Sequence, residues 1–227
     1  MEFGLQLSKG LDEFEVDTTL YRRIIGCLRY LIHTRPDMAF SVGILSRYMH
    51  SPSASHDNTL KKVLRYLKGT LGSFKQGGSK KLIGYSDSSH NTDPDDGRST
   101  TGHLFCLGET RITWCFRKQD MVALSSCESE FMAATEAAKQ DFWLQDLISE
   151  TTGRKIEKTF IRVNNISAIA LAKYHEEIDV EHVPRTEQKA DILTKALARI
   201  KFKEMSEEIQ VQNLSENGLK IKRENVG

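Results

Sequence analysis

The chain has 227 residues with a net charge of +1 at neutral pH, and 39% of the residues are hydrophobic. This length is sufficient for one domain with a buried core plus an appendage, and no stretch reaches the ~20 apolar residues that a membrane span requires. The N-terminus lacks a signal-peptide pattern, and the four cysteines form no CxxC pair, as is usual in a reducing compartment. We therefore expect an intracellular protein, in the cytoplasm or the nucleus, without membrane partners.

Charge is distributed unevenly along the chain. Residues 18–80 contain 11 Lys and Arg against two acidic residues, whereas residues 81–200 contain 15 basic against 19 acidic residues. A basic segment beside an acidic domain is consistent with an anionic polymer that one part holds and the other processes. Two solvated helix faces would give the same counts, so charge alone leaves both interpretations open.

The first part of the chain reads as a tail followed by helices. Residues 1–17 are polar and acidic without periodicity, so we expect a tail or an initial loop. From residue 18, apolar side chains at helical spacing predict three short helices over 18–74. The first helix is expected to end before Pro36 and the second near residue 51, just before Pro52. The third is expected to end at residue 68, before Gly69.

Basic side chains of this helical segment lie off its predicted apolar faces. In the first helix these are Arg22, Arg23 and Arg29, since the apolar positions fall on another side of the helix. We expect these three arginines to bind a nucleic-acid backbone.

The second part of the chain begins after a flexible joint, KQGGSK at 75–80, and extends over residues 80–200. Apolar alternation and turn signals predict three strands, a helix, a strand, a helix, a strand and a final helix. Their expected ranges are 82–87, 103–107, 112–116, 125–152, 159–163, 167–174, 178–183 and 186–197. After residue 198 clear periodicity is lost, so we expect a frayed helix and then a disordered tail, with residues 201–227 as a polar C-terminal tail.

Acidic side chains fall where these strands and helices turn toward one another. Asp87 ends the first strand, Glu128 and Glu130 lie near the start of the long helix, and Asp191 lies on the final helix. Each has an ordinary alternative, because Asp followed by serine also forms turns and glutamate near a helix N-terminus offsets the helix dipole. The functional interpretation is that Asp87, one of the two glutamates and Asp191 supply the hard oxygen ligands that two Mg²⁺ ions need for phosphodiester hydrolysis.

A series of motifs occurs in a characteristic order along the chain. They are YRRIIGCLRYLIHTRPDMAFSVGILSRYMHSPS, LKKVLRYLKGT, KLIGYSDSSH, GRSTTGHLF, ITWC, VALSSCESEFMAA, ISAIALAK and QKADILTKAL. In this order they resemble the C-terminal region of the Pol polyprotein of plant copia-type LTR retrotransposons, from the end of the reverse transcriptase through the ribonuclease H domain. The resemblance implies an α/β fold: a ribonuclease H-like mixed five-stranded sheet flanked by helices and preceded by a small helical segment.

The resemblance also implies a catalytic site of Asp87, Glu130, Asn164 and Asp191. Asp87, Glu130 and Asp191 would bind two Mg²⁺ or Mn²⁺ ions. Glu130 is preferred because it directly precedes FMAA, and Glu128 remains the alternative. The implied substrate is RNA in an RNA/DNA hybrid, and the implied partner is the rest of a Pol polyprotein.

The chain departs from the family in two ways. Asn164 stands where the family has an aspartate, so the amide can offer an oxygen but no charge. The chain is also shortened near 173–178, and a smaller piece is missing between residues 74 and 75. We therefore expect a degenerate ribonuclease H-like protein with impaired activity. The alternatives are a non-catalytic nucleic-acid-binding remnant of a Pol polyprotein, or an unstable relic without function.

Overall fold

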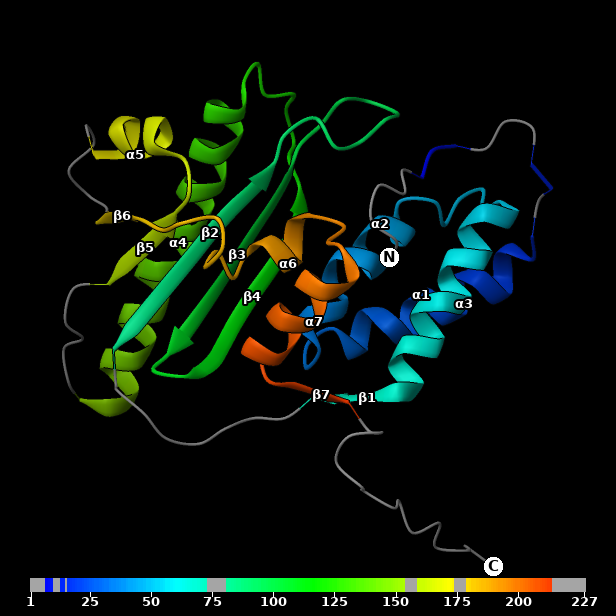
Figure 1. The fold of residues 1–227 in the computed structure, drawn as a ribbon, viewed down its shortest axis with the longest axis horizontal. Helices are drawn as coiled ribbons and strands as arrows, with labels where there is room; N and C mark the ends of the chain where they lie inside the picture. The colour runs from blue at the N-terminus through cyan, green and yellow to red at the C-terminus, as the bar shows by residue number, and fades with distance from the viewer. Residues whose placement is uncertain are drawn as a thin grey trace, which may run out of the picture.

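A five-stranded mixed sheet forms the central layer of the computed structural model, which describes residues 7–9, 13–14, 16–72, 81–153, 159–173 and 179–213. The strand order is β4-β3-β2-β5-β6 (Figure 1). The strands are β2 (Leu82–Ser89), β3 (Thr100–Leu107), β4 (Thr110–Lys118), β5 (Phe160–Val163) and β6 (Val180–His182). β2, β3 and β4 pair antiparallel, whereas β5 is parallel to β2 and β6 is parallel to β5. The expected mixed five-stranded sheet, with its flanking helices and preceding helical segment, is confirmed.

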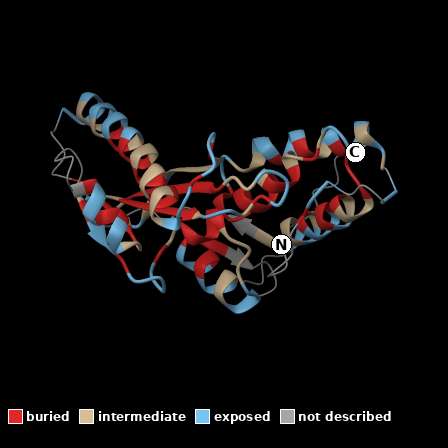
Figure 2. Cartoon of the chain, turned by 90° about the horizontal axis from the view of Figure 1, so that it is seen from above, coloured by how far each residue is buried: buried red, intermediate tan, exposed pale blue. Residues whose placement is uncertain are grey.

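Helices cover both faces of the sheet. α4 (Ser126–Thr152) lies on one face, and α6 (Asp191–Thr194) and α7 (Arg199–Glu208) lie on the other (Figure 1). α5 (Ile166–Lys173) connects β5 to the edge strand β6. Successive side chains of a strand point to opposite faces, so Phe105 packs in the core under α4 whereas Leu104 packs in the core under α6. Buried residues accordingly follow the strands and the inner sides of the helices (Figure 2).

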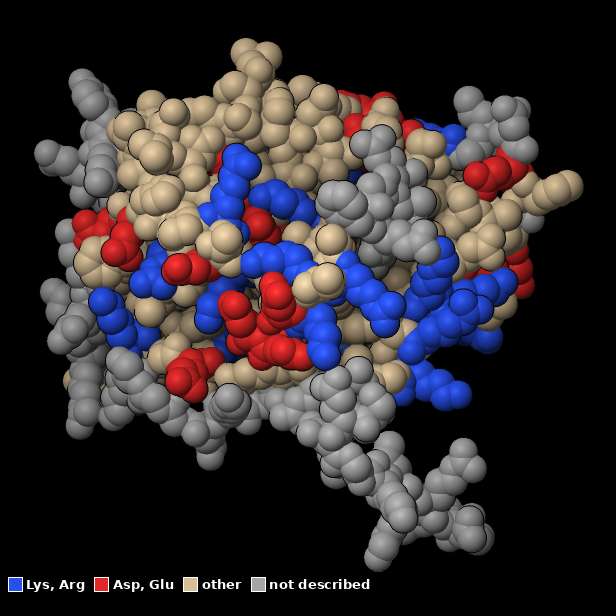
Figure 3. Space-filling model, in the orientation of Figure 1, with Lys and Arg blue, Asp and Glu red and all other residues tan. Residues whose placement is uncertain are grey.

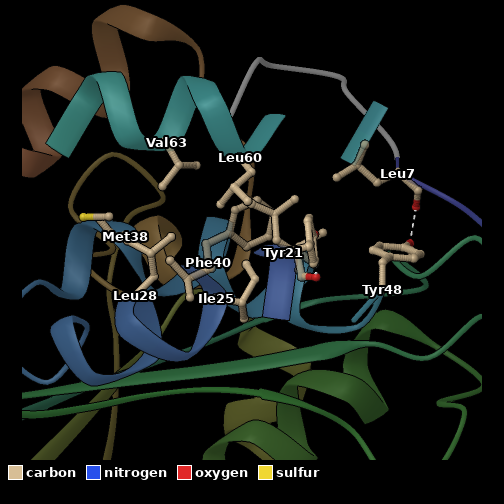
Figure 4. Packing of buried hydrophobic residues seen from close by; sticks show 12 residues of the cluster. Leu7, Tyr21, Ile25, Leu28, Met38, Phe40, Tyr48, Leu60 and Val63 are labelled. Atoms are coloured by element: carbon tan, nitrogen blue, oxygen red, sulfur yellow. Dashed lines mark hydrogen bonds between the residues drawn. The ribbon is translucent and has the colours of Figure 1, made fainter. Parts of the chain in front are cut away.

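The N-terminal segment folds around a separate apolar cluster. It contains α1 (Thr18–Leu31), a 3₁₀ turn η1 (Pro36–Met38), α2 (Ala39–Ser46) and α3 (Ala54–Gly69). Figure 4 shows Tyr21, Ile25 and Leu28 of α1 facing Leu60 and Val63 of α3. The three predicted helices are present.

The second helix and the first residues of the chain differ from the sequence-based expectation. α2 ends at Ser46 rather than near residue 51, because the following turn is held by Arg22, which donates to the carbonyl oxygens of Met49 and His50. Leu7, expected in a polar tail, is buried in the N-terminal cluster, and its carbonyl oxygen accepts a hydrogen bond from Tyr48 (Figure 4).

The helical segment packs directly against the sheet. α2 approaches β4 at Gly43, where an added Cβ would lie 2.0 Å from the Phe116 ring. Arg47, directly after α2, pairs with Asp93 in the loop after β2, with an N–O distance of 2.8 Å. The Trp114 indole of β4 donates to the Ile32 carbonyl after α1 at 2.9 Å. The joint predicted at 75–80 lies outside the described residues.

Two expectations for the C-terminal region are wrong. The final helix, predicted over 186–197, is limited to the four residues of α6, because the buried Gln188 side chain binds the backbone of Ser86 and Ala190 and holds the preceding residues in turns. Residues 201–213 are not a polar tail. They continue α7 and form β7 (Val211–Asn213), which pairs antiparallel with β1 (Thr70–Gly72).

α7 and β7 are ordered by apolar packing. Met205, Ile209 and Val211 are buried in the cluster beneath α6, at a spacing that two intervening charged residues obscure in the sequence. The shortened stretch near 173–178 falls largely on residues 174–178, which lie outside the described residues. Within the described ranges, no helix is both long and apolar enough to cross a membrane.

Candidate active site

The candidate site is centred on Asp87, a fully buried side chain on the central strand β2. Asp87 is paired with Gly102 of β3, and the missing side chain at Gly102 allows α6 to lie directly on the sheet. A Cβ at Gly102 would lie 2.6 Å from Thr194 and 2.9 Å from Leu193. This close approach enables the Thr194 hydroxyl to donate a hydrogen bond to Asp87 Oδ2.

Asp191 is brought to the same place by the short helix α6, of which it is the first residue. Lys195, one residue after this helix, links the two carboxylates. Its ammonium group lies 2.9 Å from Asp87 Oδ1 and 2.6 Å from Asp191 Oδ1. The two aspartates are therefore held by one shared cation.

Asn164 approaches from the neighbouring parallel strand. It directly follows β5, whose carboxyl end lies beside that of β2, and side chains at such an edge converge. The Asn164 amide nitrogen donates to Asp87 Oδ1 at 3.4 Å. The structure thus brings Asp87, Asn164 and Asp191 together.

Glu130 reaches the cluster from α4, whereas Glu128 does not. Glu130 is 7% exposed and accepts a hydrogen bond from the Ser88 backbone, but its Oε2 is buried with no partner among the described residues. Glu128 instead accepts from the Leu124 backbone nitrogen at 2.7 Å, as an ordinary helix-start residue does. The geometry therefore favours Glu130 over Glu128 as the neighbour of Asp87.

Burial and mutual repulsion alter the acidity of the cluster. Burial raises the pKa of Asp87 to about 6, with a further contribution from Asp191 that Lys195 and Thr194 oppose. Burial, and then the nearby Asp87 charge, raises the pKa of Glu130 to about 8. Because burial and like charges both disfavour ionisation, the pKa directions show that several carboxylates share one poorly solvated place.

The donor set fits a divalent cation in its chemistry. Carboxylate and amide oxygens are hard ligands of the kind that Mg²⁺ prefers, and Glu130 Oε2, which has no partner in the described part of the chain, is a buried acceptor that a cation would satisfy. Within the described ranges, however, no three His, Cys, Asp or Glu residues are grouped as they are around a metal ion. An ion would have to take over oxygens that Lys195 now contacts.

The predicted nucleic-acid-binding arginines differ from one another. Arg23 and Arg29 are exposed on α1, whereas Arg22 is committed to the turn after α2. Lys and Arg gather over the region of α1 and α3 in Figure 3. The exposed basic residues of α3 are Lys61, Lys62, Arg65 and Lys68. A binding role for this surface remains a prediction.

Three residues that build the site were missed in the sequence. Thr194 and Lys195 follow Asp191 closely, and an Asp and a Lys four residues apart suggest a local ion pair. That spacing gives no sign of contact with Asp87, more than a hundred residues away. Gly102 carries no local signal either, because its role depends on a helix that is distant in the sequence.

Comparisons with known proteins agree with the motif order. No family model matches the chain. The "Retrovirus-related Pol polyprotein from transposon RE2" of Arabidopsis thaliana is 36% identical over 220 residues, which cover 86% of this chain. The "Secreted RxLR effector protein 161" of Plasmopara viticola is 42% identical over 137 residues, which cover 59% of this chain and 96% of that protein. The chain spans only 15% of the RE2 polyprotein.

Among solved structures, LC11-RNase H1 in complex with an RNA/DNA hybrid is similar with a TM-score of 0.38 and 15% identity. The match covers 50% of this chain and 94% of that chain.

Proposed function

The chain belongs to the Pol polyproteins of copia-type LTR retrotransposons, and on that premise we propose that residues 80–200 are a degenerate ribonuclease H domain. Its ancestral reaction is hydrolysis of RNA in RNA/DNA hybrids. The observation that carries this proposal is the convergence of Asp87 and Asp191, which share Lys195, with Asn164 at Asp87 Oδ1 and with Glu130 buried on α4. The elements that carry these side chains lie far apart in the sequence, and simple helix capping would not direct their carboxyl groups toward one another.

Each side chain has a distinct part in the proposed site. Asp87, Glu130 and Asp191 supply oxygen ligands for two divalent ions, Mg²⁺ or Mn²⁺. When bound, these ions activate water and stabilise the leaving oxygen of a phosphodiester. Glu130 must give up a proton before it can serve, because its pKa is raised to about 8.

Asn164 is the reason to expect impaired activity. Its amide contributes no negative charge at a place where two divalent ions repel each other. The amide also donates to Asp87 Oδ1 and so occupies one of the oxygens that an ion needs. The site therefore lacks both a charge and part of a ligand.

The basic surface of the helical segment is proposed to hold the nucleic-acid backbone beside this site. Arg23 and Arg29 of α1 are exposed and can pair with phosphates, whereas Arg22 stabilises the fold. We place the protein inside the cell, in the cytoplasm or nucleus, where the hybrid and the rest of a Pol polyprotein would be its partners. A binder without catalysis, or a relic, is the alternative.

Reversion of Asn164 tests the proposal. Asn164→Asp should raise Mg²⁺-dependent cleavage of a labelled RNA/DNA hybrid by roughly tenfold or more, equivalent to ~1.4 kcal/mol of barrier. Without Mg²⁺ the variant should be less stable because like charges meet. With Mg²⁺ it should gain stability, because the ion binds the folded state.

Asp87→Asn in the reverted chain is the matched control, since it keeps the side-chain shape and removes the central carboxylate. Cleavage should then disappear. If Asn164→Asp shows neither cleavage nor a Mg²⁺-dependent gain in stability, the acids are not a catalytic site. Hybrid binding that persists in that case would favour the non-catalytic remnant, and its absence would favour the relic.

A further inference from the structure

Lys195 occupies an unusual position for a lysine beside a proposed metal site. Its ammonium lies between Asp87 Oδ1 and Asp191 Oδ1, at 2.9 and 2.6 Å. The Asp87 side chain is fully buried and that of Asp191 is 11% exposed, whereas that of Lys195 is 35% exposed. The lysine therefore covers the solvent side of the two carboxylates.

We propose that Lys195 is a built-in cation of this cluster, which competes with divalent ions for the same two carboxylate oxygens and so sets the metal affinity of the site. This inference rests on the proposed function, because it assumes that Asp87 and Asp191 are metal ligands. It adds a positioning residue that holds the acids in register and lowers their affinity for ions.

Charge balance supports the competition. Asp87 and Asp191 bring two negative charges to the cluster, and Lys195 neutralises one of them. Asn164 adds none. With an aspartate at position 164 the lysine would neutralise a smaller share of the charge. The present combination of Asn164 and Lys195 therefore favours an internal ion pair over ion binding.

The side chain of Lys195 is also able to leave. Its flexible four-carbon stem ends in a compact charge, and Lys195 directly follows α6 in extended backbone at φ −131° and ψ 146°. Glu130 Oε2 is buried without a partner in the described ranges, so it is a further acceptor that Lys195 leaves unsatisfied and that an ion would contact. An ion that displaced the Lys195 ammonium would replace its two contacts, to Asp87 and Asp191, and would also contact Glu130.

The first experiment compares Lys195→Met with Lys139→Met. Both changes remove an ammonium and keep a linear side chain, but Lys139 pairs with Glu136 on the exposed surface of α4. Calorimetric titration with Mn²⁺ should show at least tenfold tighter binding to Lys195→Met than to the wild-type chain, and unchanged binding to Lys139→Met. Lys195→Met should also unfold at a lower temperature in EDTA and recover when Mn²⁺ is added.

A second measurement uses the wild-type chain and therefore remains informative if Lys195→Met does not fold. Mn²⁺ should increase the rate at which acetic anhydride acetylates Lys195, followed by mass spectrometry, because the displaced ammonium enters solvent. The rate at Lys139 should not change. An unchanged Lys195 rate at saturating Mn²⁺, or equal Mn²⁺ affinity in wild type and Lys195→Met, overturns the inference and leaves the proposed function standing. If neither the wild-type chain nor Lys195→Met binds Mn²⁺, the inference and the proposed function are both overturned.

Discussion

His103 shows how a single buried residue makes stability depend on pH. It lies on β3 beneath α4, and its Nδ1 has no partner among the described residues. Burial lowers its pKa to about 4, and the attraction of Glu136 opposes this only weakly. The unfolded chain therefore binds a proton more readily than the folded chain between about pH 6.5 and 4. The stability that neutral His103 provides is complete above this window and is lost as pH falls through it.

We predict that His103→Phe removes this pH dependence. Relative to the variant, the wild-type chain should lose about 2 kcal/mol of unfolding free energy between pH 7 and pH 5, at about 1.4 kcal/mol per pKa unit. Urea denaturation at both pH values measures the difference and cancels the contributions of the acidic cluster. His182→Gln on the exposed edge strand β6 is the control and should follow the wild-type profile. Parallel profiles for wild type and His103→Phe would contradict the prediction.

Sequence motifs indicated which side chains belong to the candidate site but not which contacts hold them in place. The positions of Asp87, Glu130, Asn164 and Asp191 follow from motif order, because each motif retains its place on a strand or helix. The contact between Lys195 and Asp87 could not be predicted, since local spacing explains Lys195 equally well as a surface ion pair with Asp191. A short sequence motif does not reveal which distant residues its side chains contact in the folded chain.

At the scale of elements, the packing of α2 on β4 depends on the absence of a side chain. Gly43 lies against the Phe116 ring, which is itself held by Phe40 and Arg47. A methyl group at 2.0 Å from a ring atom cannot be accommodated unless the helix or the ring moves. Gly26 of α1, in contrast, has no described residue within 4 Å of an added Cβ beyond its own helix and chain neighbours.

We therefore predict opposite effects for the same substitution in two helices. Gly26→Ala should stabilise the chain by ~0.5 to 1 kcal/mol through helix propensity. Gly43→Ala should destabilise it by ~1 to 3 kcal/mol, because overpacking exceeds that gain. Chemical denaturation measures both effects. Phe116→Leu should rescue Gly43→Ala in a double-mutant cycle, and strictly additive effects would show that the ring is not the obstacle.

Elements with clear periodicity were predicted well, and those defined by distant contacts were not. α4 begins and ends where Ser125 and Gly153 indicate, because capping is local chemistry. α6 is shorter than its sequence suggests, since buried Gln188 binds the backbone of β2 and interrupts the helix. After Ala198 only a frayed helix was expected, and the full extent of α7 and the strand β7 were missed, because their apolar residues are few and find their partners only in the tertiary structure.

At the scale of the whole molecule, the C-terminal end of the described residues is joined to the N-terminal helical segment. β7 pairs with β1 directly after α3, so the C-terminal region contacts the N-terminal helical segment. The cluster beneath α6 includes Ala39 from α2 together with Met205, Ile209 and Val211. The helical segment and the sheet therefore share buried residues, and we expect them to unfold in one cooperative transition.

Truncation tests this expectation. A chain that ends after Ala198 loses α7 and β7 and with them the burial of Met205, Ile209 and Val211. Each such side chain contributes ~1.5 to 3 kcal/mol, so the total loss of roughly 4.5 to 9 kcal/mol is comparable to the whole stability of an ordinary domain. We predict that this chain melts without a sharp transition or aggregates.

A chain that ends after Asn213 keeps every described contact and is the matched control. Calorimetry of both should show a single transition for the longer chain and a broad or absent one for the shorter. Equal melting temperatures would mean that α7 and β7 contribute little to the shared core, and separate transitions in the longer chain would mean that the helical segment and the sheet fold independently.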